Sequence, residues 1–163
     1  MHTIHITSVI HAPVERVFNL SRNLDLHKKS MECNKEKAID GVTGGLINLN
    51  ESVTWEAKHF FKTRRFTSKI TAMKPYESFT DEMQKGDFKS FQHQHHFKTM
   101  KNGTIVIDIV KYEIPYGIIG RLLNRFYLHN YLKSLIERKN QFIKEYAESN
   151  KWESFLPEEI KIS

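Results

Sequence analysis

The sequence predicts an α+β domain in which a curved antiparallel β-sheet wraps around one long C-terminal helix. Two observations predict this fold class. Segments of alternating apolar and polar residues repeat between residues 48 and 112, separated by polar turns. Residues 128–146 instead carry apolar side chains at helical spacing on one stripe. Because neither element can bury its apolar side alone, the helix must cover one face of the sheet, and the curvature leaves an internal cavity between them.

The N-terminal part combines one strand with two short helices. Thr3–His11 alternates apolar and polar residues and is expected to form the first strand. The segment HAPVERVFNL is expected to form a short helix, because Pro13 suits a first helical turn. A second short helix or turn is expected in SRNLDLHKKS, and a polar edge strand at Glu32–Asp40.

Five further strand-like segments follow, and the turns KTR, KPYE, KGD and KNG separate them. The pair Asn102-Gly103 is a strong hairpin signal, because it tolerates the positive φ values of a tight turn. With the preceding edge strand, these segments predict a six-stranded antiparallel meander. The expected strands are Ser52–Phe61, Arg65–Met73, Ser78–Gln84, Phe88–Thr99 and Thr104–Ile114.

The C-terminal region is expected to be helical as far as Ser149. From Leu128 the apolar positions share one stripe, whereas the apolar positions of residues 119–126 lie on a stripe rotated by about half a turn. A straight helix cannot bury both stripes on one side, so we expect a kink or break near Phe126–Leu128.

The chain is expected to form one domain, at residues 1–149, followed by a tail at residues 150–163. A length of 163 residues, with 39% hydrophobic and 27% charged residues, is typical of one globular domain. The tail carries Trp152 and Phe155, which we expect to dock on a surface that the sequence does not identify.

Several classes of protein are excluded by composition. No apolar run approaches the ~20 residues of a membrane span, so no integral membrane segment is expected. The N-terminus lacks the pattern of a signal peptide, and the expected location is cytoplasmic. Cys33 is the sole cysteine, which excludes an internal disulfide and a cysteine-based zinc site.

The formal net charge of +6 permits weak attraction to anionic partners. The densest basic cluster, at Lys62, Arg64 and Arg65, is interpreted as a solvated hairpin tip. Because no recognition helix or RNA-binding signature accompanies this cluster, we expect no nucleic-acid partner.

The order and spacing of these segments resemble the SRPBCC superfamily, whose fold is also called START-like or helix-grip. Within it, the nearest likeness is to bacterial proteins related to polyketide cyclase/dehydrase and to carbon-monoxide-dehydrogenase accessory proteins. Matching segments include IHAPVERVFNL, FTSKITAMKPYESFTDEM, GDFKSFQHQHHF and YLKSLIERKNQFIKEYA, and the resemblance covers most of residues 3–148. It implies a deep cavity between sheet and long helix that holds a small apolar or amphipathic molecule. The superfamily includes carriers, receptors, cyclases and oxygenase domains, so the resemblance is specific for fold and not for activity.

Three histidines in the segment SFQHQHHF are the most conspicuous candidates for chemistry. Side chains alternate along a strand, so Phe91, His93, His95 and Phe97 share one face. The two phenylalanines mark this face as the inner one, and His96 is expected to be solvated on the other. The same alternation, with the family pattern deciding the last strand, predicts an inner polar set of His59, Asp81, His93, His95, Asp108 and Tyr112.

Three interpretations of this polar set remain open. A buried hydrogen-bond network would satisfy the groups mutually, since an unpaired buried polar group costs ~1–3 kcal/mol. Alternatively, aromatic walls with converging polar groups are typical of small-molecule pockets. The third interpretation, a metal site on His93 and His95 with His59 or Asp81, is disfavoured because only the first two share a face by local spacing. We therefore expect no metal and no cofactor.

We expect the protein to bind a small hydrophobic or amphipathic ligand, lipid-like or polyketide-like, as a carrier or sensor and without catalysis. The alternative is a cyclase, dehydratase or hydrolase that uses a His–Asp pair as general acid/base, with candidates His93, His95, Asp81 and Asp108. A second alternative is a protein-interaction module, and a weak homodimer is left open. The expected ligand-binding residues are Trp55, His59, Phe79, Asp81, Phe91, His93, His95, Asp108, Tyr112, Leu132 and Ile136.

Overall fold

The computed structural model describes residues 1–59, 61–115, 117 and 127–157, and of His59 only the backbone. The strands are β1 His2–Ile10, β2 Lys37–Gly41, β3 Ser52–His59, β4 Lys62–Lys74, β5 Ser78–Lys85, β6 Ser90–Met100 and β7 Gly103–Glu113. The helices are α1 Val14–Ser21, α2 Leu24–Ser30 and α4 His129–Ala147, with short 3-10 helices η1 Glu32–Asn34 and η3 Asn150–Ser154.

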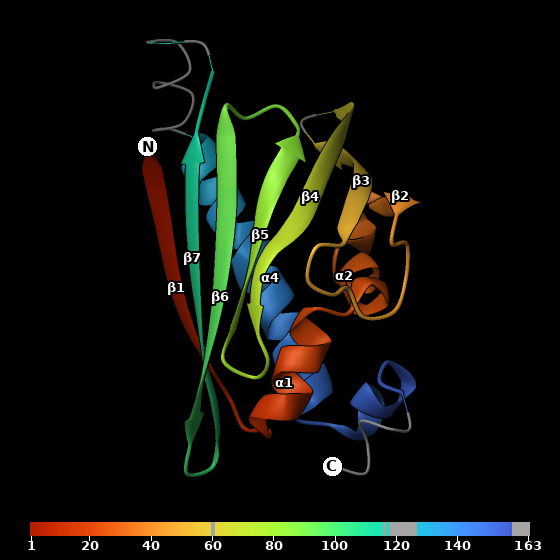
Figure 1. Ribbon diagram of the computed structural model, residues 1–163, viewed down its shortest axis with the longest axis vertical. Helices are drawn as coiled ribbons and strands as arrows, with labels where there is room; N and C mark the ends of the chain where they lie inside the picture. Colours follow the sequence, from red (N-terminus) through yellow and green to blue (C-terminus); the bar gives the residue numbers. More distant parts are fainter. Residues whose placement is uncertain (60, 116, 118–126, 158–163) are drawn as a thin grey trace.

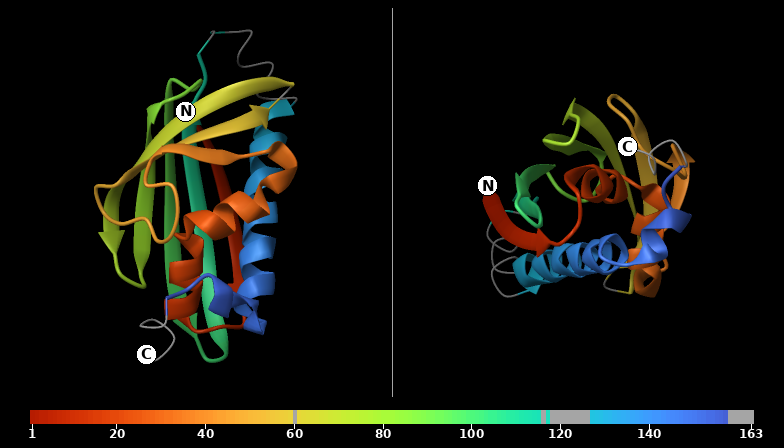
Figure 2. Two further views of the ribbon diagram at one scale, coloured as in Figure 1. Left: turned by 90° about the vertical axis from the view of Figure 1, so that its right-hand side faces the viewer. Right: turned by 90° about the horizontal axis from the view of Figure 1, so that it is seen from below.

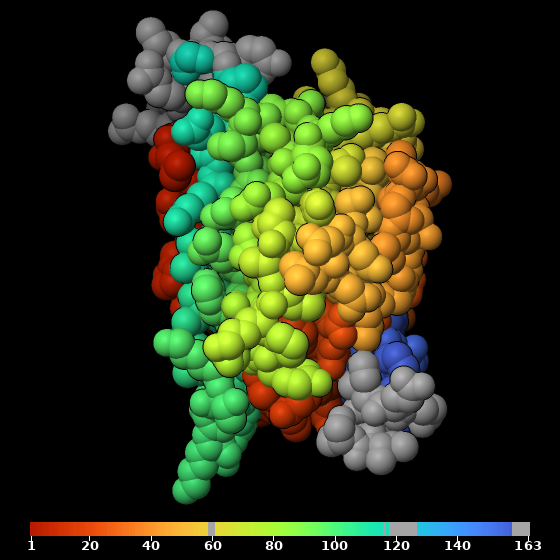
Figure 3. Space-filling model, in the orientation of Figure 1, coloured from red at the N-terminus to blue at the C-terminus, as the bar shows by residue number. Residues whose placement is uncertain are grey.

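The strands form one antiparallel seven-stranded sheet in the order β1-β7-β6-β5-β4-β3-β2 (Figure 1). The first strand therefore pairs with the last, and β2 to β7 form the predicted meander. Figure 2 shows the sheet curving around the helices, with α4 along its concave side. In the space-filling view, the outer face of the strands conceals α4 (Figure 3). The predicted fold class is confirmed.

Strand alternation decides which residues face the helix. In β7, Thr104, Val106, Asp108, Val110 and Tyr112 are all buried, and the residues between them are not. This pattern confirms the inward orientation expected for Asp108 and Tyr112.

In β6, His93, His95 and Phe97 are buried, as predicted, and Phe91 is half-buried. His96 lies on the outer face, as its position in the alternation predicts. It is half-buried there, so it is less exposed to solvent than expected.

The expected strand at Glu32–Asp40 is wrong in its first half. Met31 to Lys35 continue the turns of α2 through hydrogen bonds from Asn34 N to Met31 O and from Lys35 N to Glu32 O, both 2.9 Å. Lys35 then adopts a left-handed conformation with φ 52°, and the strand begins only at Lys37. The kink expected near Phe126–Leu128 involves residues that lie outside the described part of the chain.

The interior contains two apolar clusters, which we call the lower core and the upper core by their places in Figure 1. The lower core is centred on Phe18 of α1, whose ring contacts Phe79 at 5.7 Å and Phe97 at 5.2 Å between centroids. The upper core contains the buried residues Ile4, Ile6, Val110 and Tyr112, with half-buried Phe88, Phe91, Ile114, Leu128, Leu132 and Ile136 around them.

The tail docks on the lower core, as its aromatic residues predict. Trp152 and Phe155 pack against this core, and Leu156 is 4% exposed within it. The Arg16 guanidinium lies 4.2 Å from the centre of the Trp152 ring, and Asn23 Nδ2 donates to Phe155 O at 2.7 Å. These contacts hold the tail against α1 and α2.

Candidate functional site

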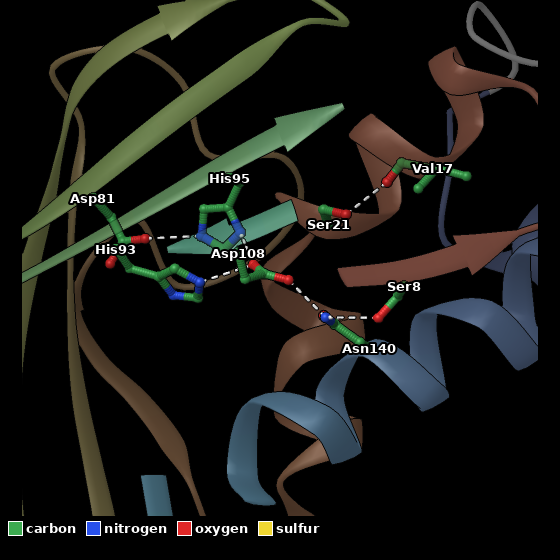
Figure 4. Close-up of polar contacts among 8 residues, drawn as sticks. All are labelled: Ser8, Val17, Ser21, Asp81, His93, His95, Asp108 and Asn140. Carbon is green, nitrogen blue, oxygen red and sulfur yellow. Dashed lines mark hydrogen bonds and ion pairs between the residues drawn. The ribbon is translucent and has the colours of Figure 1, made fainter. Parts of the chain in front are cut away.

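A layer of polar side chains, all buried except the half-buried Asp81, lies between the two cores, and Figure 4 shows the contacts within it. Asp81 comes from β5, His93 and His95 from β6, Asp108 from β7 and Asn140 from α4. Sheet register brings the first four together, because Asp81 pairs with His93 and His95 pairs with Asp108 across adjacent strands. We call these five residues the polar layer.

Asp108 is the centre of the polar layer. Its Oδ1 accepts hydrogen bonds from His93 Nε2 and from His95 Nδ1, both at 2.8 Å. Its Oδ2 accepts from Asn140 Nδ2 at 2.6 Å, and the same amide donates to Ser8 Oγ at 3.3 Å. Asp108 is 1% exposed, so these donors replace water around its charge.

The second carboxylate of the layer, Asp81, is held at its edge. His95 Nε2 lies 3.1 Å from Asp81 Oδ2, so both nitrogens of this imidazole meet a carboxylate. The His95 ring also stacks on Phe79, with centroids 4.2 Å apart, and lies 3.7 Å from the His93 ring. Packing and hydrogen bonds together determine the orientation of the His95 ring.

The environment shifts the pKa values of the two histidines in opposite directions. Burial and the neighbouring cation His95 lower the pKa of His93. Burial also acts to lower the pKa of His95, but hydrogen bonds to Asp108 and Asp81 outweigh it and raise that pKa. These shifts favour the neutral imidazole at His93 and the imidazolium at His95.

Both carboxylates are stabilised as anions. Burial acts to raise the pKa of Asp108, but hydrogen bonds from His93 and His95 outweigh it and hold that pKa well below its usual range. Burial likewise opposes ionisation of Asp81, and the hydrogen bond from His95 outweighs it, so the pKa of Asp81 is lowered.

A pocket of about 70 Å³ adjoins the polar layer on its Asp81–His95 side. Its walls combine apolar side chains, including Trp55 and Phe79, with polar ones, including Arg22 and Lys139. We call it the polar pocket. A buried water needs ~10–15 Å³ of such volume, so the polar pocket has room for a few waters or a small polar group.

The structure divides the predicted ligand-binding residues among different places. Trp55, Phe79, Asp81 and His95 line the polar pocket, whereas Phe91 lines a second pocket of about 310 Å³ at the upper ends of β5 and β6. His93 and Asp108 belong to the polar layer. Tyr112, Leu132 and Ile136 lie in the upper core, where the Tyr112 hydroxyl is 3.2 Å from His129 Nδ1. The side chain of His59 lies outside the described part of the structure.

Phe91 leaves the expected pocket because two strands separate. β5 pairs with β6 only from Ser78 to Glu82, and above this point Phe91 reaches across to Phe66 of β4, at 5.3 Å between ring centroids. Phe91 therefore lines a different pocket from Trp55 and Phe79, although all three were expected to bind one ligand.

Arg22, Lys139 and Asn140 are candidate functional-site residues that were not predicted from the sequence. A signal for Asn140 was present, since it follows Leu132 and Ile136 at four-residue spacing on the buried stripe of the helix. Lys139 adjoins the same stripe. Arg22 gave no signal, because its position follows from how α1 and α2 meet the sheet.

Asp81, His93 and His95 could hold a metal ion, since each offers one ligand atom within 4.8 Å of the others. Two imidazoles and a carboxylate form a donor set that zinc and iron accept in proteins. Asp108 would then support both histidines, as carboxylates commonly do behind metal ligands. The same groups also satisfy one another by hydrogen bonds that need no ion.

No helix in the described residues is long and apolar enough to cross a membrane.

Sequence comparison identifies one family. The profile described as polyketide cyclase / dehydrase and lipid transport matches residues 10–138. Comparison with curated proteins gives no sequence match.

Several solved structures are similar to this chain. Protein TTHA0849 of Thermus thermophilus has a TM-score of 0.69 at 19% identity, over 87% of this chain and 97% of that one. Major latex-like protein 151 of Panax ginseng has a TM-score of 0.66 at 16% identity, over 90% and 97% of the two chains. Protein Ms6760 of Mycobacterium smegmatis has a TM-score of 0.65 at 17% identity, over 88% of each chain. At these identities the similarity establishes the helix-grip fold.

Proposed function

Because the chain belongs to the polyketide cyclase/dehydrase and lipid transport family of the SRPBCC superfamily, we propose that it binds a small hydrophobic or amphipathic ligand between the sheet and α4. Its role would be that of a carrier or sensor. The observation that carries this proposal is the polar pocket, in which the apolar walls of Trp55 and Phe79 meet the converging polar groups of His95, Asp81 and Lys139.

The ligand would need more room than the polar pocket offers. Pockets for small molecules typically measure ~300–1,000 Å³, whereas this one measures about 70 Å³. The upper core supplies the expansion in our proposal, because six of its apolar side chains are only half-buried in the described structure. A ligand that covers them gains ~25 cal/mol for each Å² of apolar surface removed from water.

Fluorescence titration with N-phenyl-1-naphthylamine, a neutral apolar dye, tests this proposal. We expect saturable binding of one dye per chain. Ile136→Trp should weaken binding about tenfold or more, because it fills space beside the upper core. Leu49→Trp is the matched control, since Leu49 is an exposed apolar residue outside both cores. Dye binding that does not saturate, or that survives Ile136→Trp unchanged, would contradict ligand binding at this place.

A second candidate function is catalysis by general acid and base. It is favoured by the opposite pKa shifts of neighbouring His93 and His95, since paired groups with separated pKa values are typical of acid–base sites. His95 lines the polar pocket and would donate a proton there, with Asp81 as its partner. Turnover of a polyketide-like or ester substrate that is lost in His95→Gln would favour an enzyme of cyclase, dehydratase or hydrolase type. Turnover that His95→Gln leaves unchanged would exclude this role.

A further inference from the structure

The polar pocket contains an excess of positive charge. Two cationic side chains, Arg22 and Lys139, line it together with the imidazole of His95 and a single carboxylate, Asp81. Asp81 is hydrogen-bonded to His95, and Glu51 acts on Arg22 through space, which leaves Lys139 without a close carboxylate among the described residues. An anion entering the pocket would correct this imbalance.

Lys139 is the least satisfied of these cations. It is half-buried and makes no hydrogen bond or ion pair with the residues that the structure describes, although its charge acts on Asp81 and His95 through space. On the same helix, Lys133 and Lys144 each meet a glutamate one turn onward, Glu137 at 3.7 Å and Glu148 at 3.6 Å.

The helix itself cannot neutralise Lys139. Its neighbours at three and four residues in either direction are all apolar: Leu135, Ile136, Phe142 and Ile143. The lysine therefore stands among residues of the apolar stripe and lines the polar pocket.

Two other side chains of the polar pocket could donate hydrogen bonds to an anion bound there. Arg22 donates to Asn19 Oδ1, Asn48 Oδ1 and Ile47 O, which are neutral, and forms no ion pair among the described residues, although Glu51 acts on it through space. Ser68 lines the pocket at 6% exposure, and its hydroxyl has no hydrogen-bond partner among those residues.

We propose that the polar pocket receives an organic carboxylate at the polar end of the ligand, with Lys139 as its ion-pair partner. The inference rests on the proposed function and adds the chemical class of the ligand: an amphipathic acid. A carboxylate fits the small volume, and the apolar remainder of the ligand would continue along Trp55 and Phe79 toward the upper core. A charge-assisted hydrogen bond to a half-buried lysine is stronger than one to a solvated lysine.

Displacement of N-phenyl-1-naphthylamine by decanoate and by 1-decanol tests the proposal, because the two compounds share a chain and differ in charge at neutral pH. We expect the wild-type protein to bind decanoate at least about tenfold more tightly than decanol. Lys139→Met should abolish this preference by weakening decanoate alone, and Lys139→Arg should largely retain it. Lys133→Met is the control, since it removes the same charge from an exposed position of the same helix.

Each outcome has a distinct meaning. Equal binding of acid and alcohol by the wild type, or an unchanged preference in Lys139→Met, would overturn the carboxylate site and leave ligand binding intact. Failure of both compounds to displace the dye, or failure of the dye itself to bind, would overturn the proposed function and this inference with it. Thermal unfolding of each variant shows whether it is folded, and Lys139→Gln replaces Lys139→Met if the latter does not fold.

Discussion

The lower and upper cores share one sheet but differ in how completely they are closed. Among the described residues, the lower core holds eighteen buried apolar residues and is covered by α1, α2 and η3. The upper core holds four such residues with six half-buried ones around them, so its half-buried residues outnumber its buried ones, whereas the lower core has nine half-buried residues around its eighteen. A fully buried side chain has no more surface to lose, whereas a half-buried one gains when a ligand covers it. We therefore expect the lower core to contribute most of the stability of the fold, and the upper core to adapt its packing to a bound ligand.

Truncation of one large residue in each core should separate the two roles most strongly. Phe18→Ala should lower the free energy of unfolding by ~3–5 kcal/mol, because Phe18 is 2% exposed and its ring contacts two other phenylalanines. Ile136→Ala should cost less than ~2 kcal/mol, because Ile136 is half-buried. Urea denaturation measures both values. Equal costs would remove the distinction between the cores.

A substitution in the polar layer between the cores should have the next largest effect on the free energy of unfolding. Asp108→Asn removes the charge that binds two histidines and should destabilise the fold by ~3 kcal/mol, as expected when one partner of a buried ionic network is lost. Asp87→Asn is the control, since Asp87 pairs with Arg64 at the surface and should contribute less than ~1 kcal/mol. If both substitutions prove equally mild by urea denaturation, the layer does not support the fold.

The pH dependence of stability should report the same layer. The depressed pKa values of Asp108 and Asp81 mean that their contribution is present above the unfolded-state value of ~3.9 and is lost as pH falls through the folded values. The raised pKa of His95 means that its contribution is present below ~6.5 and is lost as pH rises through the folded value. His93, whose pKa is lowered, acts in the opposite sense and in a lower window: it reduces stability at acid pH, and this penalty is relieved as pH rises from its folded value to ~6.5.

Unfolding measured across the pH range should therefore show loss of stability on the acid side of ~4, and Asp108→Asn should make this loss shallower. An acid limb of the same steepness in the variant would separate acid unfolding from the polar layer.

The smallest expected effect is that of metal removal. We expect protein purified without a histidine tag to contain no stoichiometric zinc, iron or copper by elemental analysis, because hydrogen bonds already satisfy the three possible ligands. A chelator should then leave stability unchanged. About one metal per chain, lost in His93→Ala and in His95→Ala, would contradict this and make the enzyme the leading candidate.

Local periodicity explains what the sequence could predict. The burial of His93 and His95 follows from alternation along a single strand. Alternation alone did not orient Asp108, because both faces of its strand are partly apolar, and the family pattern decided that orientation. The strand expected from Glu32 failed because its residues are polar and show no alternation that would distinguish a strand from turns.

The contacts between residues of different strands were harder to predict from the sequence than the orientation of residues within one strand. The pairing of carboxylates with histidines depends on the register between strands. In β4 this register shifts between Thr67 and Ser68 and between Ile70 and Ala72, and no sequence pattern predicts these shifts. The place of Phe91 was lost for the same reason, since the point where β5 leaves β6 is a property of the curved sheet. Lys139 was missed although its neighbours are apolar, because a lysine on a helix is usually assigned to solvent.

The polar layer also has a consequence for how β6 avoids mispairing. A slip of one residue against β7 would turn both histidines outward and bring glutamines to the inner face, as side chains alternate. Asp108 would then lose both imidazole donors in the interior, at a cost of several kcal/mol. A slip of two residues would keep the same face inward, and an entirely apolar face would penalise it little, because one aliphatic side chain substitutes readily for another. The layer therefore discriminates against off-register intermediates during folding, which a ligand-binding cavity with few rigid contacts would otherwise tolerate.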